Sequence, residues 1–369
     1  MAGAWMLWGD LDAASLPKVS LHDHLDGALR PRTIVELAAE SGFPLPATGE
    51  SALADWFHES ADSGSLVDYL ATFAVTLGVM QTAPQLERVA REYVEDLVAD
   101  GVVYGEVRWA PEQHGGAGLT PEQAVEAVQA GLEQGMAAAA ATGHAIRVGQ
   151  LVSAMRHQHG GLAAAELAVA HRDRGVVGFD IAGPEAGFPP SQHRVAFDYL
   201  AEQAMPVTVH AGEADGLASI RSALLDGRAL RLGHGVRIAE DLDVQREDAE
   251  GSTVTIGPLA RWVRDRRIAL ELSPQSNLQT GAIAEWGSAL ADHPFDLLYQ
   301  LGFHVTVNTD NRLMSDTSLS KELTLLADEF EYDLDDLLTF QLNAAEAAFL
   351  PLEEREELRD RLTRAYDGL

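Results

Sequence analysis

The 369-residue chain contains no cysteine, which excludes disulfide bonds, thiolate metal sites and a cysteine nucleophile. It also has little positive charge. Its 26 lysines and arginines stand against 57 aspartates and glutamates, giving a formal net charge of −31. A surface this acidic argues against nucleic acid or an anionic membrane as the main partner. It favours a neutral or cationic small molecule as the substrate.

Long hydrophobic runs are missing as well, because no stretch approaches the roughly 18 apolar residues of a membrane-spanning helix. The N-terminal residues have no basic region and carry acidic residues early, which is atypical of a signal peptide. With the lack of cysteine, these features predict a cytoplasmic protein that has no membrane partner. The sequence predicts no particular oligomeric state.

Short apolar or β-branched runs alternate with Ala/Leu/Glu-rich helical stretches along the whole chain. Eight such runs predict an α/β fold of the TIM-barrel type, (β/α)₈, as a single domain over residues 1–369. An open doubly wound sheet is the alternative, but no G-x-G-x-x-G or Walker pattern follows any run. The predicted strands are Lys18–Leu25, Val102–Ala110, Ile146–Ser153, Val176–Ala182, Pro206–Glu213, Leu230–Val236, Ile268–Pro274 and His304–Asp310.

A long insertion, residues 43–99, separates the first two predicted strands and reads as helical. Its start is rich in Gly, Pro and Ser, and Ser65 with Asp68 resembles a helix-capping pair. Five apolar side chains then share one helical stripe, which packs either into the core or over a nearby site as a lid. They are Leu66, Tyr69, Leu70, Phe73 and Leu77.

Potential metal ligands gather at the ends of the predicted strands. His22 and His24 lie two residues apart in KVSLHDHLDG, so on a strand both side chains point to one face. Catalytic groups of parallel barrels cluster where the strands end. Asp26 follows them at the end of the same strand, and the other strand ends carry His210, Glu213, His234, Asp310 and Asn311. Three histidines with one carboxylate suit zinc, or iron or manganese in its place. The alternative is that one histidine of the pair is structural and the other solvated.

These segments resemble the adenosine deaminase family of amidohydrolases. KVSLHDHLDG, HAGE at 210–213, LGHG at 232–235 and NTD at 308–310 carry the resemblance. It extends to VVYGEVRWAP (102–111), GFDIAGPE (178–185), SPQSNLQTG (273–281) and NAAEAAFLP (343–351). The motifs follow one another in the expected order over nearly the whole chain.

The resemblance implies one divalent metal ion, Zn²⁺, held by His22, His24, His210 and Asp310 with a water in the remaining position. A zinc ion lowers the pKa of such a water toward roughly 7. Among the catalytic residues, Glu213 would deliver a proton to purine N1, so we expect burial to raise its pKa. His234 would orient or deprotonate the water together with Asp310.

The resemblance also places four residues at the substrate. Gly183 would present its backbone N–H to purine N3, Asp26 would bind the ribose 5′-hydroxyl, and His24 would lie beside the substrate. Asn311 departs from the family pattern, which has a second aspartate there. Its amide donates a hydrogen bond at any pH, whereas a carboxyl donates only when protonated. Asn311 therefore either keeps recognition of the purine or marks a different substrate.

The expected activity is hydrolytic deamination of adenosine or 2′-deoxyadenosine to inosine or 2′-deoxyinosine and ammonia. The alternative substrates are an aminodeoxyfutalosine-like nucleoside, adenine or an N6-substituted purine. A barrel that has lost catalysis, or one that cleaves another amide or ester bond, is a further alternative. His157 and His159 form a second HxH, predicted to lie at the surface or behind the site. Arg312 is the nearby cation that would reach an anionic substituent.

Overall fold

A computed structural model describes residues 5–247 and 251–368. Eight parallel strands form two four-stranded sheets, with orders β3-β4-β5-β6 and β7-β8-β11-β12. Each of the eight predicted runs contains one of these strands, with small shifts at the ends. The strands are β3 (Lys18–His24), β4 (Val102–Trp109), β5 (Arg147–Met155), β6 (Val176–Ala182), β7 (Thr208–Ala211), β8 (Arg231–His234), β11 (Ala269–Leu272) and β12 (Val305–Val307).

Two parallel bridges join the sheets into a closed barrel. Phe179 of β6 pairs with Val207 just before β7, and Asp23 of β3 pairs with Asp310 just after β12. At the second bridge the backbone N–H of His24 donates to Asp310 O at 2.8 Å. The predicted (β/α)₈ barrel is therefore confirmed, and its first and last strands meet where the candidate ligands lie.

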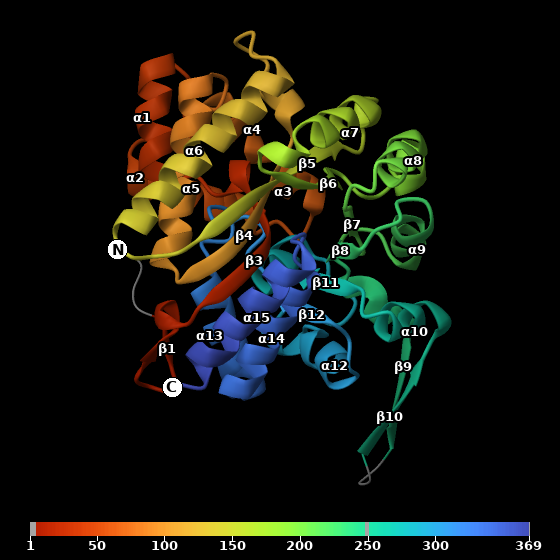
Figure 1. Ribbon diagram of the computed structural model, residues 1–369. Helices are drawn as coiled ribbons and strands as arrows, with labels where there is room; N and C mark the ends of the chain where they lie inside the picture. The colour runs from red at the N-terminus through yellow and green to blue at the C-terminus, as the bar shows by residue number, and fades with distance from the viewer. Residues whose placement is uncertain (1–4, 248–250, 369) are drawn as a thin grey trace.

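Helices surround the barrel (Figure 1). The helix after β4 begins with a capping box. Thr120 Oγ1 accepts a hydrogen bond from Gln123 N, Gln123 Oε1 accepts one from Thr120 N, and Pro121 occupies the first turn. The helices after β4 are α6 (Pro121–Ala141), α7 (Gly161–Ala170), α8 (Arg194–Glu202), α9 (Leu217–Leu225), α10 (Pro258–Asp265), α11 (Pro274–Gln279), α12 (Phe295–Gln300), α13 (Leu319–Phe330), α14 (Leu334–Ala347) and α15 (Leu352–Tyr366).

Five helices fill the segment between β3 and β4. Ser65 accepts a hydrogen bond from Asp68 N at the start of α3, as the capping pattern predicts. Residues of α3 and α4 line a cavity at the carboxyl end of the barrel, and a lid function for residues 43–99 stays a prediction. The helices are α1 (Pro31–Ser41), α2 (Glu50–Ala61), α3 (Leu66–Ala71), α4 (Phe73–Gly78) and α5 (Ala83–Ala99).

Two hairpins escaped the sequence analysis. The strands β1 (Met6–Leu7) and β2 (Leu11–Asp12) are too short to show an alternating pattern. The strands β9 (Leu242–Glu247) and β10 (Gly251–Ile256) form an antiparallel arm that extends away from the barrel (Figure 1). In β9, charged and polar residues interrupt the apolar alternation that marks a strand.

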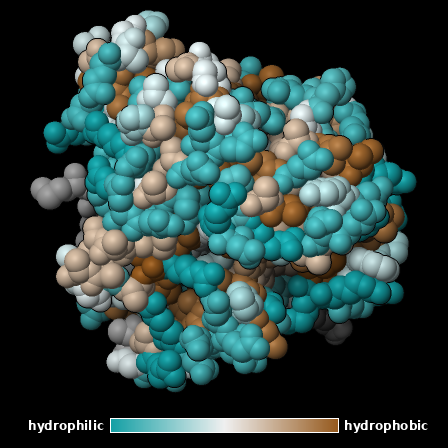
Figure 2. Space-filling view, turned by 45° about the horizontal axis from the view of Figure 1, so that its top comes forward, coloured by the Kyte–Doolittle hydropathy of each residue, from teal (hydrophilic) through white to brown (hydrophobic). Residues whose placement is uncertain are grey.

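The face turned toward the viewer in Figure 2 is largely hydrophilic, with hydrophobic residues in smaller groups, as the high content of charged residues suggests. Within the described ranges, no single helix meets the length and hydropathy that crossing a membrane requires. Only the pair Leu66–Gly78 and Ala83–Ala99 would meet them together, and its two halves are bent by 117°.

The barrel interior is unusually rich in charge. TIM barrels generally fill this space with layers of branched apolar side chains. Here the strands also contribute fully buried acids and arginines to it. These are Glu106, Arg108, Asp180, Arg231 and Glu271. Buried charges persist only when they are paired and hydrogen-bonded, so this cluster must have specific partners.

Candidate active site

The strand ends meet around one cavity of about 340 Å³ at the carboxyl end of the barrel. Eight of the nine site residues predicted from the sequence line it, and His22 lies fully buried next to them. The eight are His24, Asp26, Gly183, His210, Glu213, His234, Asp310 and Asn311. The structure thus brings together all the candidate residues, although their roles stay predictions.

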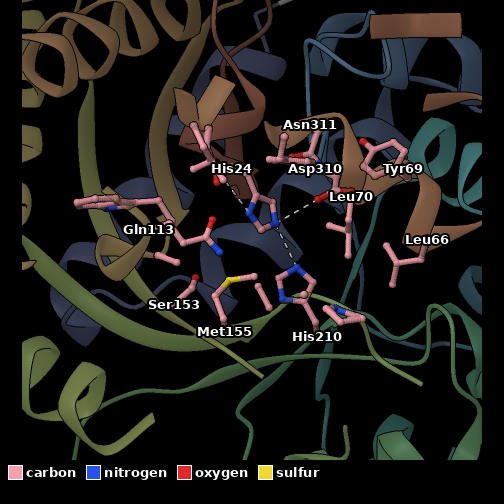
Figure 3. Close-up of a pocket in the computed structure, with 18 of the residues that line it drawn as sticks. His24, Leu66, Tyr69, Leu70, Gln113, Ser153, Met155, His210, Asp310 and Asn311 are labelled. Atoms are coloured by element: carbon pink, nitrogen blue, oxygen red, sulfur yellow. Dashed lines mark hydrogen bonds and ion pairs between the residues drawn. The ribbon is translucent and has the colours of Figure 1, made fainter. Parts of the chain in front are cut away.

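Three of the distances between the predicted ligand atoms are nearly equal. His22 Nε2 is 3.2 Å and His24 Nε2 is 3.3 Å from Asp310 Oδ1, and the two Nε2 atoms of His24 and His210 are 3.1 Å apart. Figure 3 shows His24 between Asp310 and His210. Atoms bound tetrahedrally to Zn²⁺ at about 2.0–2.1 Å lie roughly 3.3 Å from one another. The spacing therefore fits one zinc-sized ion.

The hydrogen bonds of His22 and His210 place the proton of each ring on Nδ1, which leaves Nε2 able to bind a cation. His22 Nδ1 donates to Glu271 Oε2 at 2.9 Å, and His210 Nδ1 donates to Asp180 and to Ile181 O at 3.0 Å. In the neutral rings, both Nε2 atoms then carry a lone pair directed at the cluster. His22 Nε2 is buried and has no hydrogen-bond partner within the described residues. A divalent cation at this point would satisfy these lone pairs together.

His234 competes with His24 for a place in this centre. His22, His210, His234 and Asp310 each offer a ligand atom within 4.8 Å of the others. His234 Nε2, however, lies 3.5 Å from Glu213 Oε2, and its Nδ1 contacts Asn277 at 2.9 Å. His24 Nε2 lies within 3.3 Å of candidate ligand atoms of Asp310 and His210, so His24 also stays a candidate ligand.

Glu271 accepts the hydrogen bond from His22 Nδ1 on the side away from the candidate metal position. The sequence analysis did not identify this residue. Its carboxylate also accepts hydrogen bonds from Arg108 Nη2 at 2.7 Å, Arg231 Nε at 2.6 Å and Thr208 Oγ1 at 3.0 Å. Although burial raises the pKa of Glu271, the two arginines hold it well below its usual value. The charged barrel interior thus anchors a candidate metal ligand, as carboxylates behind metal-binding histidines commonly do.

Replacing Glu271 by glutamine is expected to weaken zinc binding about 10–100-fold, because His22 loses the carboxylate that fixes its tautomer and orientation. Competition with a chromogenic chelator measures the affinity. Glu106→Gln is the matched control, since Glu106 is equally buried and pairs with Arg231 but contacts no imidazole. Equal zinc affinities in the two variants would contradict this role.

A second carboxylate, Glu185, shapes the loop that carries Glu213. It accepts hydrogen bonds from four consecutive backbone N–H groups, of residues 212–215, at 2.7–3.0 Å. Glu213 is thereby held in the cavity wall with Oε1 buried and without a partner among the described residues. Burial, together with the charges of Asp310 and Glu185, raises the pKa of Glu213 well above its usual value, as expected.

His234 and Asp310 reach the cavity from unusual backbone positions. Both adopt left-handed conformations, with φ of 60° and 58° respectively, which few non-glycine residues do. Such outliers persist when their surroundings enforce them and they cluster at functional sites. For Asp310 these surroundings include Ser276, whose hydroxyl donates to Asp310 Oδ2 at 2.6 Å.

The predicted substrate contacts lie around the same space. Gly183 has φ +99°, and a Cβ there would sit 3.0 Å from Met155 Cε, so glycine is needed for the backbone to border the cavity. Asp26 Oδ1 and Asn311 Oδ1 are buried without hydrogen-bond partners in the described part of the chain. These positions leave polar groups free for a ligand.

One sequence interpretation, that of Arg312, needs correction. Arg312 does not extend into the cavity, because its Nε lies 2.8 Å from buried Asp23 and its guanidinium stacks over Tyr93 at 4.7 Å. His157 is exposed, as expected, but it also lines the cavity rim beside Gly183. His159 lines a different hollow that borders α7.

The rest of the wall is mainly apolar. The predicted helical stripe of α3 and α4 supplies much of it, and Leu66, Tyr69 and Leu70 appear on one side of the close-up in Figure 3. Among the described residues, no lysine or arginine lines the cavity. It therefore suits a flat, uncharged ligand with a few polar edges.

The chain is similar to known proteins along its whole length. A family model described as Adenosine deaminase matches residues 17–365. Adenosine deaminase from Mycobacteroides abscessus is 54% identical over 355 residues, covering 95% of this chain and 96% of that protein. Adenosine deaminase 1 from Streptomyces coelicolor is 56% identical over 340 residues, covering 92% of this chain and 84% of that protein.

A solved structure shares the fold at lower identity. The amidohydrolase from Burkhoderia ambifaria with bound Zn has a TM-score of 0.81 and 24% identity. The match covers 96% of this chain and 92% of that one. At this identity the similarity supports the barrel fold alone.

Proposed function

Since this chain belongs to the adenosine deaminase family, we propose that it catalyses the hydrolytic deamination of adenosine and 2′-deoxyadenosine to inosine and 2′-deoxyinosine, with release of ammonia. The observation that carries the proposal is one cavity that combines a buried cluster of candidate metal ligands with a buried glutamate whose pKa is raised. His22, His24, His210 and Asp310 would hold a divalent ion, Zn²⁺, at that point. The enzyme would act as one domain in the cytoplasm.

When bound, the zinc ion supplies a Lewis acid that makes hydroxide available at neutral pH. The protein's own residues supply the rest. Glu213 keeps its proton at neutral pH because its pKa is raised, so it can deliver that proton to purine N1. C6 then becomes electrophilic enough for water to add and for ammonia to leave. His234, 3.5 Å from the Glu213 carboxyl, orients or deprotonates the water.

Substrate recognition would use the polar groups that the cavity leaves free. Gly183 presents backbone to purine N3, and Asp26 accepts a hydrogen bond from the 5′-hydroxyl. Asn311 donates its amide to the purine, at any pH, and His24 borders the sugar. The apolar stripe of α3 and α4 would cover the purine ring, so residues 43–99 would act as a lid.

A neutral nucleoside is the expected substrate, because the described cavity wall contains no cation that would neutralise a phosphate. Burying an unpaired charge costs several kcal/mol. We therefore expect kcat/KM for AMP to be at least about 10²-fold below that for adenosine. Comparable values for the two would show that a 5′-phosphate has a binding site.

The direct test follows the ultraviolet absorbance of the purine together with ammonia release. Adenosine, 2′-deoxyadenosine, adenine and an N6-substituted purine nucleoside are assayed in parallel with purified, zinc-loaded protein. The proposal expects the two nucleosides to be deaminated fastest. Failure to deaminate either nucleoside would contradict it, and faster turnover of adenine or the N6-substituted compound would replace it with the alternative.

A further inference from the structure

Behind the cavity, three polar side chains form a buried chain that ends at His234. Asn277 Nδ2 lies 2.9 Å from His234 Nδ1, and His293 Nε2 lies 3.2 Å from Asn277 Oδ1. The three side chains belong to residues that are 3% exposed or less. In a region that excludes water, each buried polar atom needs a protein partner, and every donor must face an acceptor. The direction of the chain can therefore be worked out from a group whose role is fixed.

That group is the backbone N–H of Phe295, which can only donate. It donates to His293 Nδ1 at 3.0 Å, at the first turn of α12, where helix N–H groups need partners. His293 Nδ1 must then carry a lone pair. Burial lowers the pKa of His293 to about 3, so the ring is neutral at pH 7. Its single proton resides on Nε2.

The donor-to-acceptor order of these hydrogen bonds also fixes the roles of Asn277 and His234. His293 Nε2–H donates to Asn277 Oδ1, which leaves the Asn277 Nδ2 amide directed at His234 Nδ1. An amide NH₂ only donates, so His234 Nδ1 also carries a lone pair. A ring that keeps a lone pair on one nitrogen is neutral and carries its single proton on the other. The proton of His234 is therefore on Nε2, the nitrogen near Glu213.

We propose that Asn277 and His293 are positioning residues that hold His234 as an Nε2–H hydrogen-bond donor at the cavity. This inference deepens the proposed function and rests on it only for its catalytic consequence. With its proton on Nε2, His234 has no lone pair there to bind a metal ion or to accept a proton. It instead donates a hydrogen bond to the attacking water and orients it. The water's proton then passes to Asp310, and the remaining hydroxide adds to C6.

Nuclear magnetic resonance of the zinc-loaded enzyme tests the tautomer without substrate. In protein labelled with ¹⁵N-histidine, long-range ¹H–¹⁵N correlations show which ring nitrogen carries the proton, and a His234→Gln variant identifies the peaks. The expected result is a neutral ring protonated on Nε2 at pH 7. A proton on Nδ1, or on both nitrogens, would overturn the inference.

Asn277→Asp tests the positioning role, because a carboxylate accepts and would draw the His234 proton to Nδ1. A wrong tautomer in a histidine-dependent site costs up to about 10⁴-fold in kcat, and we expect a loss of roughly 10²–10⁴-fold. Asn343→Asp is the matched control. Asn343 is half-buried on α14 and its amide donates to Val305 O, so this variant adds the same charge elsewhere.

The outcomes separate this inference from the proposed function. If Asn277→Asp folds and its His234 proton stays on Nε2, Asn277 has no positioning role. If Asn277→Asp fails to fold, His293→Phe removes the donor that orients Asn277, and a mixture of His234 tautomers is expected instead of one. A single Nε2–H tautomer there would refute the role of His293. A native tautomer in protein that deaminates no purine would remove only the proposed function.

Discussion

Replacing Glu213 by glutamine is expected to lower kcat for adenosine about 10²–10⁴-fold, the usual contribution of a general acid. Glutamine keeps the size of the side chain and can donate a hydrogen bond, but it cannot release a proton to purine N1. Glu213 is 4% exposed and burial raises its pKa, which favours the protonated form that the proposed mechanism requires at the start. Initial rates of adenosine loss at saturating substrate measure the effect.

Glu285→Gln provides the control for the Glu213 variant. Its carboxylate is 63% exposed and pairs with Arg237 outside the cavity, so kcat should stay within about twofold of wild type. Zinc content and thermal unfolding of both variants should also match wild type. Wild-type turnover by Glu213→Gln would remove this residue from the mechanism.

Removing the divalent metal is expected to lower activity by at least about 10³-fold. Lewis-acid assistance is worth several kcal/mol, and each 1.4 kcal/mol corresponds to a factor of ten in rate. Dialysis against a chelator followed by one equivalent of Zn²⁺ should remove and then restore deamination. A chelated preparation that stays fully active, with its metal content measured as zero, would contradict the proposed centre.

His210→Ala ties the metal effect to this site. The variant lacks an imidazole whose Nε2 lies 3.1 Å from that of His24, so added zinc should fail to restore its activity. His144→Ala is the control, because His144 is exposed and contacts only the neighbouring Thr142 side chain among the described residues. Its activity should follow the wild-type pattern of loss and recovery.

The barrel and its ligand cluster were predictable because both follow from local rules. Eight apolar runs separated by helices indicate parallel strands, and polar groups at the carboxyl ends of such strands converge. His22 and His24 share a face because strand side chains repeat every two residues. Residues as distant as His24 and Asp310 therefore could be placed together before the structure was known.

The supporting carboxylates were not predictable by the same rules. Glu271 occupies a buried position within a strand, where an apolar core residue is normally found. Its partners Arg108 and Arg231 come from two other strands. Glu185 stabilises the Glu213 loop through backbone groups, which leave no mark in the sequence. Acidic and basic residues in otherwise apolar runs, such as GEVRW and ALEL, are the signal that could have identified the charged interior.

The sequence also does not predict in which direction a side chain points. Arg312 follows the site residues in sequence, yet it turns away to Asp23 and Tyr93. The β9–β10 arm was missed because its two strands pair with each other outside the barrel and share only a short apolar stripe, Leu242 and Val244 beside Ile256 and Val254. Sequence adjacency thus predicts the neighbourhood of a residue but not its partner.

The left-handed backbone of His234 and Asp310 implies a trade-off between durability and turnover. Each of these conformations costs on the order of 1 kcal/mol or more relative to a relaxed one. Glycine at either position would relieve that cost and remove a side chain that the proposed reaction needs. Laboratory selection for thermal stability alone would therefore favour glycine at these two positions. The stabilised variants would be expected to lose activity.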